Sequence, residues 1–120
     1  MLQIKRIYEL PSEEDGKRIL VDRLWPRGVT REAAALYAWM KGIAPSPELR
    51  KSFNHQPEKF GEFTRLYREE LESEGMKDEL ERLGGILRSG PVTLVYAAKD
   101  TTCNHALVLK GFLEEKMGLI

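Results

Sequence analysis

The feature that most constrains the fold is a strand–loop–helix unit in the last third of the chain. Residues 92–96 read VTLVY after Pro91, and such a run of β-branched and aromatic residues is typical of a buried strand. The polar loop KDTTCNH comes next, and a helical pattern then places Ala106, Leu109 and Phe112 on one face. A strand that leads through a short loop into a covering helix predicts a sheet with parallel members.

The rest of the chain predicts further strands separated by helices. Residues 2–7 alternate between apolar and polar, and residues 19–21 form a short, continuous apolar run. Helices are expected over residues 30–40 with Thr30 as cap, over a short segment begun by Ser46 and Pro47, over an apolar stripe ended by Gly75, and over the leucines around Leu83. We therefore expect an α/β fold, a small sheet flanked by helices, as one domain over residues 1–120.

Charge and composition exclude several classes of protein. Lys+Arg and Asp+Glu each number 19, so the chain lacks the basic excess of a typical nucleic-acid binder. No apolar run approaches the roughly 20 residues of a membrane span, and the N-terminus does not resemble a signal peptide. The single cysteine, Cys103, cannot form an internal disulfide, which suits a reducing compartment. We expect a cytoplasmic protein that does not enter a membrane.

No cofactor or metal is expected from the motifs. Glycine-rich phosphate or dinucleotide loops are missing, and so are the paired spacings of zinc sites. Cys103, His105 and His55 form only a weak candidate set of metal ligands.

The first polar loop, VDRLWPRG, follows directly from the predicted strand over residues 19–21. Ligands of open α/β sheets bind beyond the carboxyl ends of the strands, which is where this loop begins. Arg23 and Arg27 can hold a carboxylate or phosphate by paired hydrogen bonds. The alternative is structural: Asp22 pairs with an arginine while Trp25 packs into the core.

The second polar loop joins the strand over residues 92–96 to the last helix. Unpaired amides at a helix N-terminus attract anions and stabilise a thiolate, which makes Lys99, Asn104 and Cys103 candidates for binding or reaction. Cys103 and His105 are two residues apart and do not face each other on a helix, so a small capping or core cysteine is preferred over a nucleophile. Asp100 and His105 remain candidates for proton transfer.

Between the two loops, Arg50 and His55 lie on a polar connection. They either reach a cleft shared with the loops or serve as surface and capping residues, and the second interpretation is favoured. The aromatic residues Phe60, Phe63 and Tyr67 repeat at helical spacing, which favours a core stripe over a stacking platform.

Taken together, the runs VDRLWPRG, APSPELR and VTLVYAAKD followed by NHA resemble the prokaryotic family named domain of unknown function 488, in its YeaO-like branch. The resemblance spans about Ile4 to Leu113 and implies a compact α/β domain, but no established activity. The matching positions are Asp22, Arg23, Trp25, Pro26, Arg27 and Gly28, then Pro45, Ser46, Leu49 and Arg50, then Tyr96, Asp100, Asn104 and Ala106.

A related branch of that family carries a Cys-His-Arg run near the third signature. Here the run is Cys103-Asn104-His105-Ala106, so the arginine is missing and the histidine is displaced. This departure makes Cys103 a weaker candidate for the site than the aspartates and arginines of the two loops.

The leading hypothesis is a protein that binds a small anionic or nucleotide-like ligand at the carboxyl ends of its strands. Arg23 and Arg27 would hold the anion, with Arg50, Lys99 and Asn104 as further binding residues. Asp22 or Asp100 would orient the arginines or act as a base, and His105 would transfer a proton, so an enzyme and a pure binding protein both stay open.

The alternative hypothesis is a non-catalytic module that binds nucleic acid or a protein partner. It would use the basic residues of the long helices, Arg65, Arg68, Lys77, Arg82 and Arg88. These alternate with many glutamates, which favours a solvated face of mixed charge.

Overall fold

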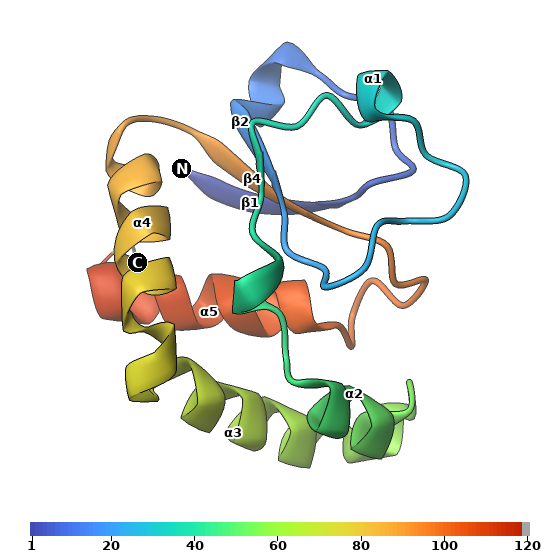
Figure 1. Ribbon diagram of the computed structural model, residues 1–120, viewed down its shortest axis with the longest axis vertical. Helices are drawn as coiled ribbons and strands as arrows, with labels where there is room; N and C mark the ends of the chain where they lie inside the picture. The colour runs from blue at the N-terminus through green and yellow to red at the C-terminus, as the bar shows by residue number, and fades with distance from the viewer. Residues whose placement is uncertain (119–120) are drawn as a thin grey trace.

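The computed structural model describes residues 1–118, and these fold around a four-stranded parallel sheet (Figure 1). The strands are β1 (Leu2–Arg6), β2 (Lys17–Leu20), β3 (Ala38–Trp39) and β4 (Val92–Tyr96). Their order is β1-β4-β2-β3, which puts the last strand of the chain inside the sheet. The predicted α/β class with parallel strands is confirmed; residues 119–120 of the expected domain lie outside the described residues.

The central strand is β4, which pairs with β1 on one side and with β2 on the other. Leu2 of β1 and Lys17 of β2 are both in register with Val92. All five residues of β4 are buried, as expected of a strand covered on both faces. The strand predicted over residues 92–96 is confirmed.

Four helices form the layer on one side of the sheet: α2 (Pro47–Phe53), α3 (Phe60–Leu71), α4 (Lys77–Arg88) and α5 (His105–Met117). In Figure 1, α5 lies directly below the strands, α2 and α3 lie below α5, and α4 stands upright at the left. Helix α5 buries Ala106, Leu109 and Phe112 against the sheet, as predicted. Phe63 and Tyr67 of α3 are 3% and 0% exposed, so the aromatic stripe belongs to the core. None of the helices within residues 1–118 is long and apolar enough to cross a membrane.

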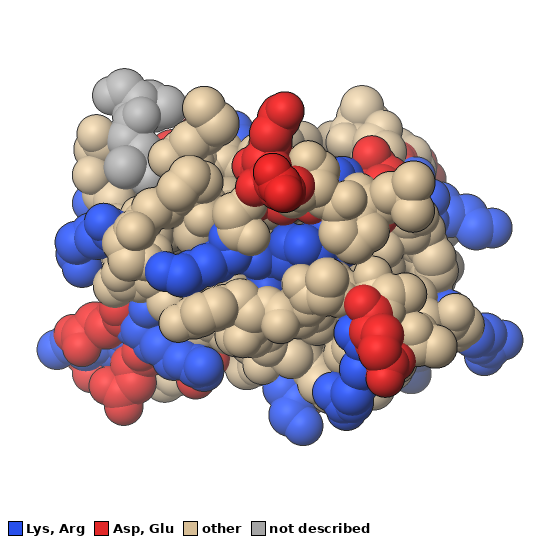
Figure 2. Space-filling model, turned by 90° about the horizontal axis from the view of Figure 1, so that it is seen from above, with Lys and Arg blue, Asp and Glu red and all other residues tan. Residues whose placement is uncertain are grey.

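The opposite face is covered by the short helix α1 (Arg31–Ala34) and by loops. A smaller apolar cluster forms there around Leu20 and Val95, and the rings of Trp25 and Trp39 meet edge to face at its border. Figure 2 shows this face, where Lys and Arg side chains gather in a band across the middle, with carboxylates around them. The two faces of the sheet therefore differ: one is apolar and helical, the other has a polar covering.

A buried ion pair fastens the loop before β2 to the polar side of the sheet. Asp15 Oδ2 lies 2.7 Å from Nη1 of Arg18, and both residues are 3% exposed. Lys5 Nζ contacts the other carboxylate oxygen at 3.1 Å. Burial raises the pKa of Asp15, but hydrogen bonds from Lys5, the Ser12 amide and Arg18 outweigh burial and hold the pKa below its ordinary value of 3.8.

The helix predicted over residues 30–40 is wrong beyond its first turn. Helix α1 ends at Ala34, because Ala35 adopts a left-handed backbone with φ of 49°. The chain then runs beside β2 as β3, where the amides of Tyr37 and Met40 donate to carbonyls of the β2 segment. This two-residue strand replaces the expected last turns of the helix.

The predicted helix caps are confirmed, while one predicted helix end is displaced. Thr30 accepts a hydrogen bond from the third amide of α1, and Ser46 does the same for α2, which begins with Pro47. Helix α3 ends at Leu71 rather than at Gly75, which lies in a short 3₁₀ turn before α4.

Candidate functional site

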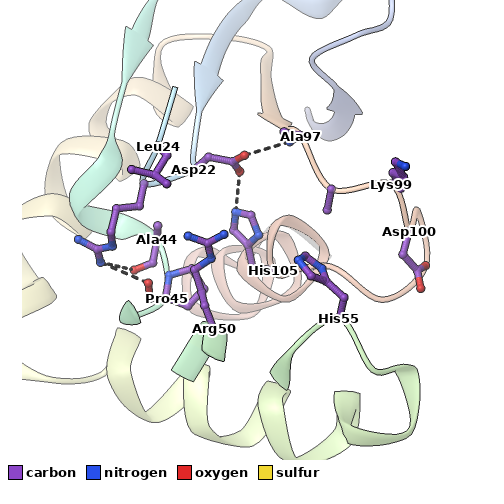
Figure 3. A pocket seen from close by; sticks show the side chains of 12 residues that line it. Asp22, Leu24, Ala44, Pro45, Arg50, His55, Ala97, Lys99, Asp100 and His105 are labelled. Atoms are coloured by element: carbon purple, nitrogen blue, oxygen red, sulfur yellow. Dashed lines mark hydrogen bonds and ion pairs between the residues drawn. The ribbon is translucent and has the colours of Figure 1, made fainter. Parts of the chain in front are cut away.

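An open cavity of about 590 Å³ lies beyond the carboxyl ends of β2 and β4 (Figure 3). We call it the main cavity; it is lined by residues 22–24, 44–45 and 97–100 together with Arg50, His55 and His105. Its volume is within the range of small-molecule sites in proteins, roughly 300–1,000 Å³. Both polar loops singled out in the sequence contribute to this one cavity.

Asp22 follows β2 and connects it to two other elements. Its Oδ2 accepts a hydrogen bond from the Ala97 amide at 3.1 Å, and its Oδ1 lies 3.0 Å from Nε2 of His105. Oδ1 is shut off from solvent. Asp22 therefore contacts a histidine rather than one of the arginines, and its geometry suits holding His105 in place.

His105 is the first residue of α5, and two oxygens surround its Nε2. The carbonyl of Val21 accepts the ring N–H at 3.1 Å, so the closer Asp22 oxygen is a charge contact rather than an aligned hydrogen bond. Both neighbouring oxygens are hydrogen-bond acceptors, so we assign the ring proton to Nε2. Within residues 1–118, the other ring nitrogen, Nδ1, has no hydrogen-bond partner. The ring of Tyr67 packs edge-on below the imidazole, with centroids 6.4 Å apart.

Tyr67 supports this arrangement from inside the core. Its hydroxyl donates to the carbonyl of Ile43 at 2.7 Å. Burial raises the pKa of Tyr67, so the hydroxyl stays protonated and remains a donor.

The predicted arginine pair, Arg23 and Arg27, does not come together. Nη2 of Arg23 donates to the carbonyls of Ala44 and Pro45, both at 3.3 Å, which fixes one wall of the main cavity. Arg27 is exposed and outside the lining, and its carbonyl accepts a hydrogen bond from the Tyr8 hydroxyl. The geometry gives Arg23 a supporting role and leaves Arg27 away from the cavity.

Other basic side chains reach the main cavity instead. Arg50 projects from α2, His55 from the turn after α2, and Lys99 from the loop after β4. In Figure 3, Arg50 and His55 point towards His105 from the opposite wall. Within residues 1–118, no carboxylate oxygen lies within 4.0 Å of the charged nitrogens of Arg50 or Lys99. These cations are therefore available to a ligand.

The backbone that carries His55 is strained. Asn54 and His55 both adopt left-handed conformations, with φ of 48° and 54°. Such a conformation costs about 1–2 kcal/mol for a residue with a Cβ. Strain of this kind concentrates at sites of function, and here it turns His55 towards the main cavity.

The loop after β4 is a capped turn in which two predicted residues have structural roles. Asp100 Oδ1 accepts hydrogen bonds from the amides of Thr102 at 2.8 Å and Cys103 at 2.9 Å, and these bonds lower the pKa of Asp100. Asn104 caps α5 by accepting from the Leu107 amide at 2.8 Å, while its Nδ2 donates to the Asp100 carbonyl. Asp100 stands at the rim of the main cavity, whereas Asn104 is occupied by the helix cap.

Cys103 lies outside the main cavity and lines a smaller one beside it. In the part of the chain that the structure describes, no three side chains of His, Cys, Asp or Glu are close enough together to hold a metal ion.

Sequence reasoning missed the backbone groups of the site and the contact of Asp22 with His105. The Ala97 amide and the carbonyls of residues 44–45 position the charged side chains, and no residue type signals their role. Leu24, which is 68% exposed at the mouth of the cavity, was also overlooked. The available signal was a leucine between Arg23 and Trp25 in a loop that is otherwise rich in charge.

A family model and several known proteins match nearly the whole of this chain. A family model described as the inactive DUF488-N3 subclade matches residues 1–118. The uncharacterized protein YeaO of Escherichia coli (strain K12) is 46% identical over 112 residues, which is 93% of this chain and 96% of that protein. The uncharacterized protein Rv3073c of Mycobacterium tuberculosis (strain ATCC 25618 / H37Rv) is 40% identical, covering 93% of this chain and 92% of its own. No solved structure matches the chain. The chain thus belongs to the DUF488 family, in the subclade that its matching model describes as inactive.

Proposed function

We propose that this protein binds a small anionic ligand in the main cavity and holds the ligand without converting it. The observation that carries the proposal is the convergence of Arg50, from α2, and Lys99, from the loop after β4, on one open cavity. Hydrogen bonds to charged donors contribute about 1.5–3 kcal/mol each, so two such residues suffice for specific binding of an anion. The positive end of the α5 dipole lies at the same place and adds to the attraction.

Two observations favour binding over catalysis. First, the subclade to which the chain belongs is described as inactive. In addition, Asp22 offers a ligand no free base, because Oδ1 is buried beside His105 and Oδ2 accepts the Ala97 amide. The polar groups of Asp22 are thus already used in holding the site together.

The test is calorimetric titration of the purified protein with inorganic phosphate and then with a panel of phosphorylated and carboxylated metabolites. Arg50→Met and Lys99→Met should each weaken binding about tenfold or more, which corresponds to the loss of one charge-assisted hydrogen bond. Arg82→Met, on the exposed surface of α4, is the matched control, because it removes the same charge far from the cavity. Binding that is equal in wild type and Arg50→Met refutes the proposal for this cavity.

A second measurement separates holding from conversion. The ³¹P NMR spectrum of a bound phosphorylated ligand should be unchanged after prolonged incubation with the protein. Appearance of a product would show that the protein is an enzyme.

The alternative, an interaction module for nucleic acid or protein, has less support. Two of the helix arginines on which it depends are already paired: Arg65 with Glu69 at 2.8 Å and Arg68 with Glu115 at 2.5 Å. A surface of paired charges gives little counterion release and so little affinity for nucleic acid. Salt-dependent binding of an oligonucleotide, lost in Arg82→Met or Lys77→Met, would restore this alternative.

A further inference from the structure

A second cavity opens directly beside the main one. We call it the side cavity; it has a volume of about 300 Å³ and is lined by residues 50–51, 53–55 and 103–105 together with Pro45, Pro47, Phe63 and Ala98. Arg50, His55 and His105 line both cavities, so they stand at the boundary between them. One ligand can therefore contact both cavities at once.

The two cavities differ in charge. The main cavity includes the carboxylates of Asp22 and Asp100 in its lining. The side cavity, as far as the described residues form it, has no carboxylate in its lining, while Arg50 and Lys51 contribute two positive charges. The two histidines at the boundary add ring nitrogens that can hydrogen-bond to a ligand. An anionic group therefore meets no carboxylate in the side cavity, whereas in the main cavity the charges of Arg23 and Lys99 are offset by those of Asp22 and Asp100.

The elements around the side cavity reinforce this difference. His105 is the first residue of α5 and Asn104 is its N-cap, so the positive end of a 13-residue helix faces the side cavity. The strained turn at Asn54 and His55 brings a further imidazole to the same boundary. The dipole of α5 and the positively charged side chains therefore both attract an anion to the side cavity.

The main cavity suits a different chemical group. It is about twice as large, and at its rim the Asp100 carboxylate has one oxygen, Oδ2, that is not used by the turn. A free carboxylate oxygen accepts hydrogen bonds from hydroxyl groups. Leu24, Ala97 and Ala98 supply apolar surface next to these acceptors. The combination fits the carbon skeleton and hydroxyls of a sugar.

We propose that the two cavities form one bipartite site for a phosphate monoester of a hydroxylated compound, such as a sugar phosphate or a nucleoside monophosphate. The phosphate binds at the boundary of the two cavities, on Arg50 and His55, which line both, and within reach of Lys51 in the side cavity, while the hydroxylated part lies in the main cavity near Asp100. This inference rests on the proposed anion-binding function and adds to it the class of ligand and its direction across the site.

Cys103 makes the test direct, because it is the single cysteine of the chain and lines the side cavity only. The rate of its alkylation by iodoacetamide is measured with inorganic phosphate, ribose, ribose 5-phosphate and adenosine monophosphate. We expect inorganic phosphate at saturation to slow alkylation about tenfold and ribose alone to leave it unchanged. Ribose 5-phosphate or adenosine monophosphate should protect at concentrations about tenfold lower than phosphate does, and the better of the two identifies the organic part.

Two variants test the direction of binding by calorimetry, independently of the thiol. Lys51→Met, which changes the side cavity alone, should weaken both inorganic phosphate and ribose 5-phosphate by about threefold to tenfold. Asp100→Asn keeps an oxygen for the turn but removes a negative charge from the main cavity. It should bind inorganic phosphate more tightly while the advantage of ribose 5-phosphate over phosphate falls.

The outcomes separate the two proposals. If phosphate binds but the ester binds no more tightly, or if the ester binds while Cys103 stays fully reactive and Lys51→Met has no effect, the bipartite site is refuted and the anion-binding function stands. If neither phosphate nor any ester binds to the wild-type protein, both proposals fail.

Discussion

Nε2 of His105 lies 3.0 Å from Oδ1 of Asp22, so a residue just beyond β2 contacts the first residue of α5. The other oxygen of the same carboxylate accepts a hydrogen bond from the amide of Ala97, just after β4. One partly buried side chain thereby joins the ends of two parallel strands to the helix that covers them, at the place where the main cavity opens.

The carboxylate should contribute to the stability of the fold as well as to the site. Asp22→Ala leaves the Ala97 amide without its acceptor, so we expect the free energy of unfolding to fall by about 1–3 kcal/mol more than in Asp22→Asn, which keeps an oxygen at that position. Urea denaturation followed by circular dichroism measures both variants. Equal losses in the two variants would show that the amide contact contributes nothing.

Replacement of His55 should have opposite effects on stability and on binding. His55→Gly relieves a left-handed conformation that costs about 1–2 kcal/mol, against about 0.4–1 kcal/mol for the added freedom of the unfolded chain. The melting temperature should therefore be equal to or above that of the wild type, while anion binding weakens. Asn54→Gly relieves the same strain at the neighbouring position and keeps the imidazole, so it is the matched control. Tighter or unchanged anion binding in His55→Gly would remove His55 from the site.

The ion pair of Asp15 and Arg18 should make stability depend on pH in a defined direction. The pKa of Asp15 is lower in the folded protein than in the unfolded chain, so the carboxylate stabilises the fold above about pH 4 and this contribution is lost as the pH falls through the folded pKa. Asp15→Asn leaves Arg18 buried without its counter-charge, which should cost about 3–5 kcal/mol at pH 7.

The measurement is urea denaturation of wild type and Asp15→Asn at pH 7, 5 and 3. The difference between the two proteins should persist at pH 5 and shrink at pH 3. Glu13→Gln, an exposed change of the same charge in the same turn, should show little difference at any of these pH values. If the difference in free energy of unfolding between wild type and Asp15→Asn stayed constant down to pH 3, the role of the Asp15 charge would be contradicted.

Two glycines with similar backbone conformations should respond differently to substitution. Gly16 and Gly28 have φ of 65° and 79°, but a Cβ at Gly16 would collide with the carbonyl of Pro91, whereas a Cβ at Gly28 would meet nothing within 4 Å. Gly28→Ala should cost about 1–2 kcal/mol from backbone strain alone. Gly16→Ala should cost about 3 kcal/mol or more, because the collision adds to that strain. Thermal denaturation measures the stability of both variants. Equal losses of stability would show that the backbone at Pro91 moves away from the added Cβ at little cost.

Sequence patterns predicted the elements whose signals are local. The strand of residues 92–96 and the inward face of α5 follow from hydrophobic periodicity, and the caps at Thr30 and Ser46 follow from the hydrogen bonds that those side chains make. The strand β3 was missed because its two residues follow an alanine-rich segment that favours helix. Contacts with β2, which are distant in sequence, overrode that preference.

For the candidate site, sequence predicted which loops meet but not which charges face the cavity. The rule that ligands bind beyond the carboxyl ends of strands pointed to the loops that carry Asp22, Lys99, Asp100 and His105, and these four residues line one cavity. It could not distinguish Arg27, which points away, from Arg50, which points in, because the direction of each side chain depends on the path of a loop or on the placement of α2. These placements arise from packing between distant segments.

The place of β4 between β1 and β2 has a consequence for how the chain is made. During synthesis β1 and β2 leave the ribosome before β4, but neither pairs with the other, and the strand that joins them, Val92–Tyr96, emerges only after helices α1 to α4. At about 5–20 residues per second, β1 waits several seconds for its partner. The nascent chain must therefore remain without its complete sheet until β4 has emerged, and the sheet then closes through pairings between segments far apart in the sequence, which form slowly.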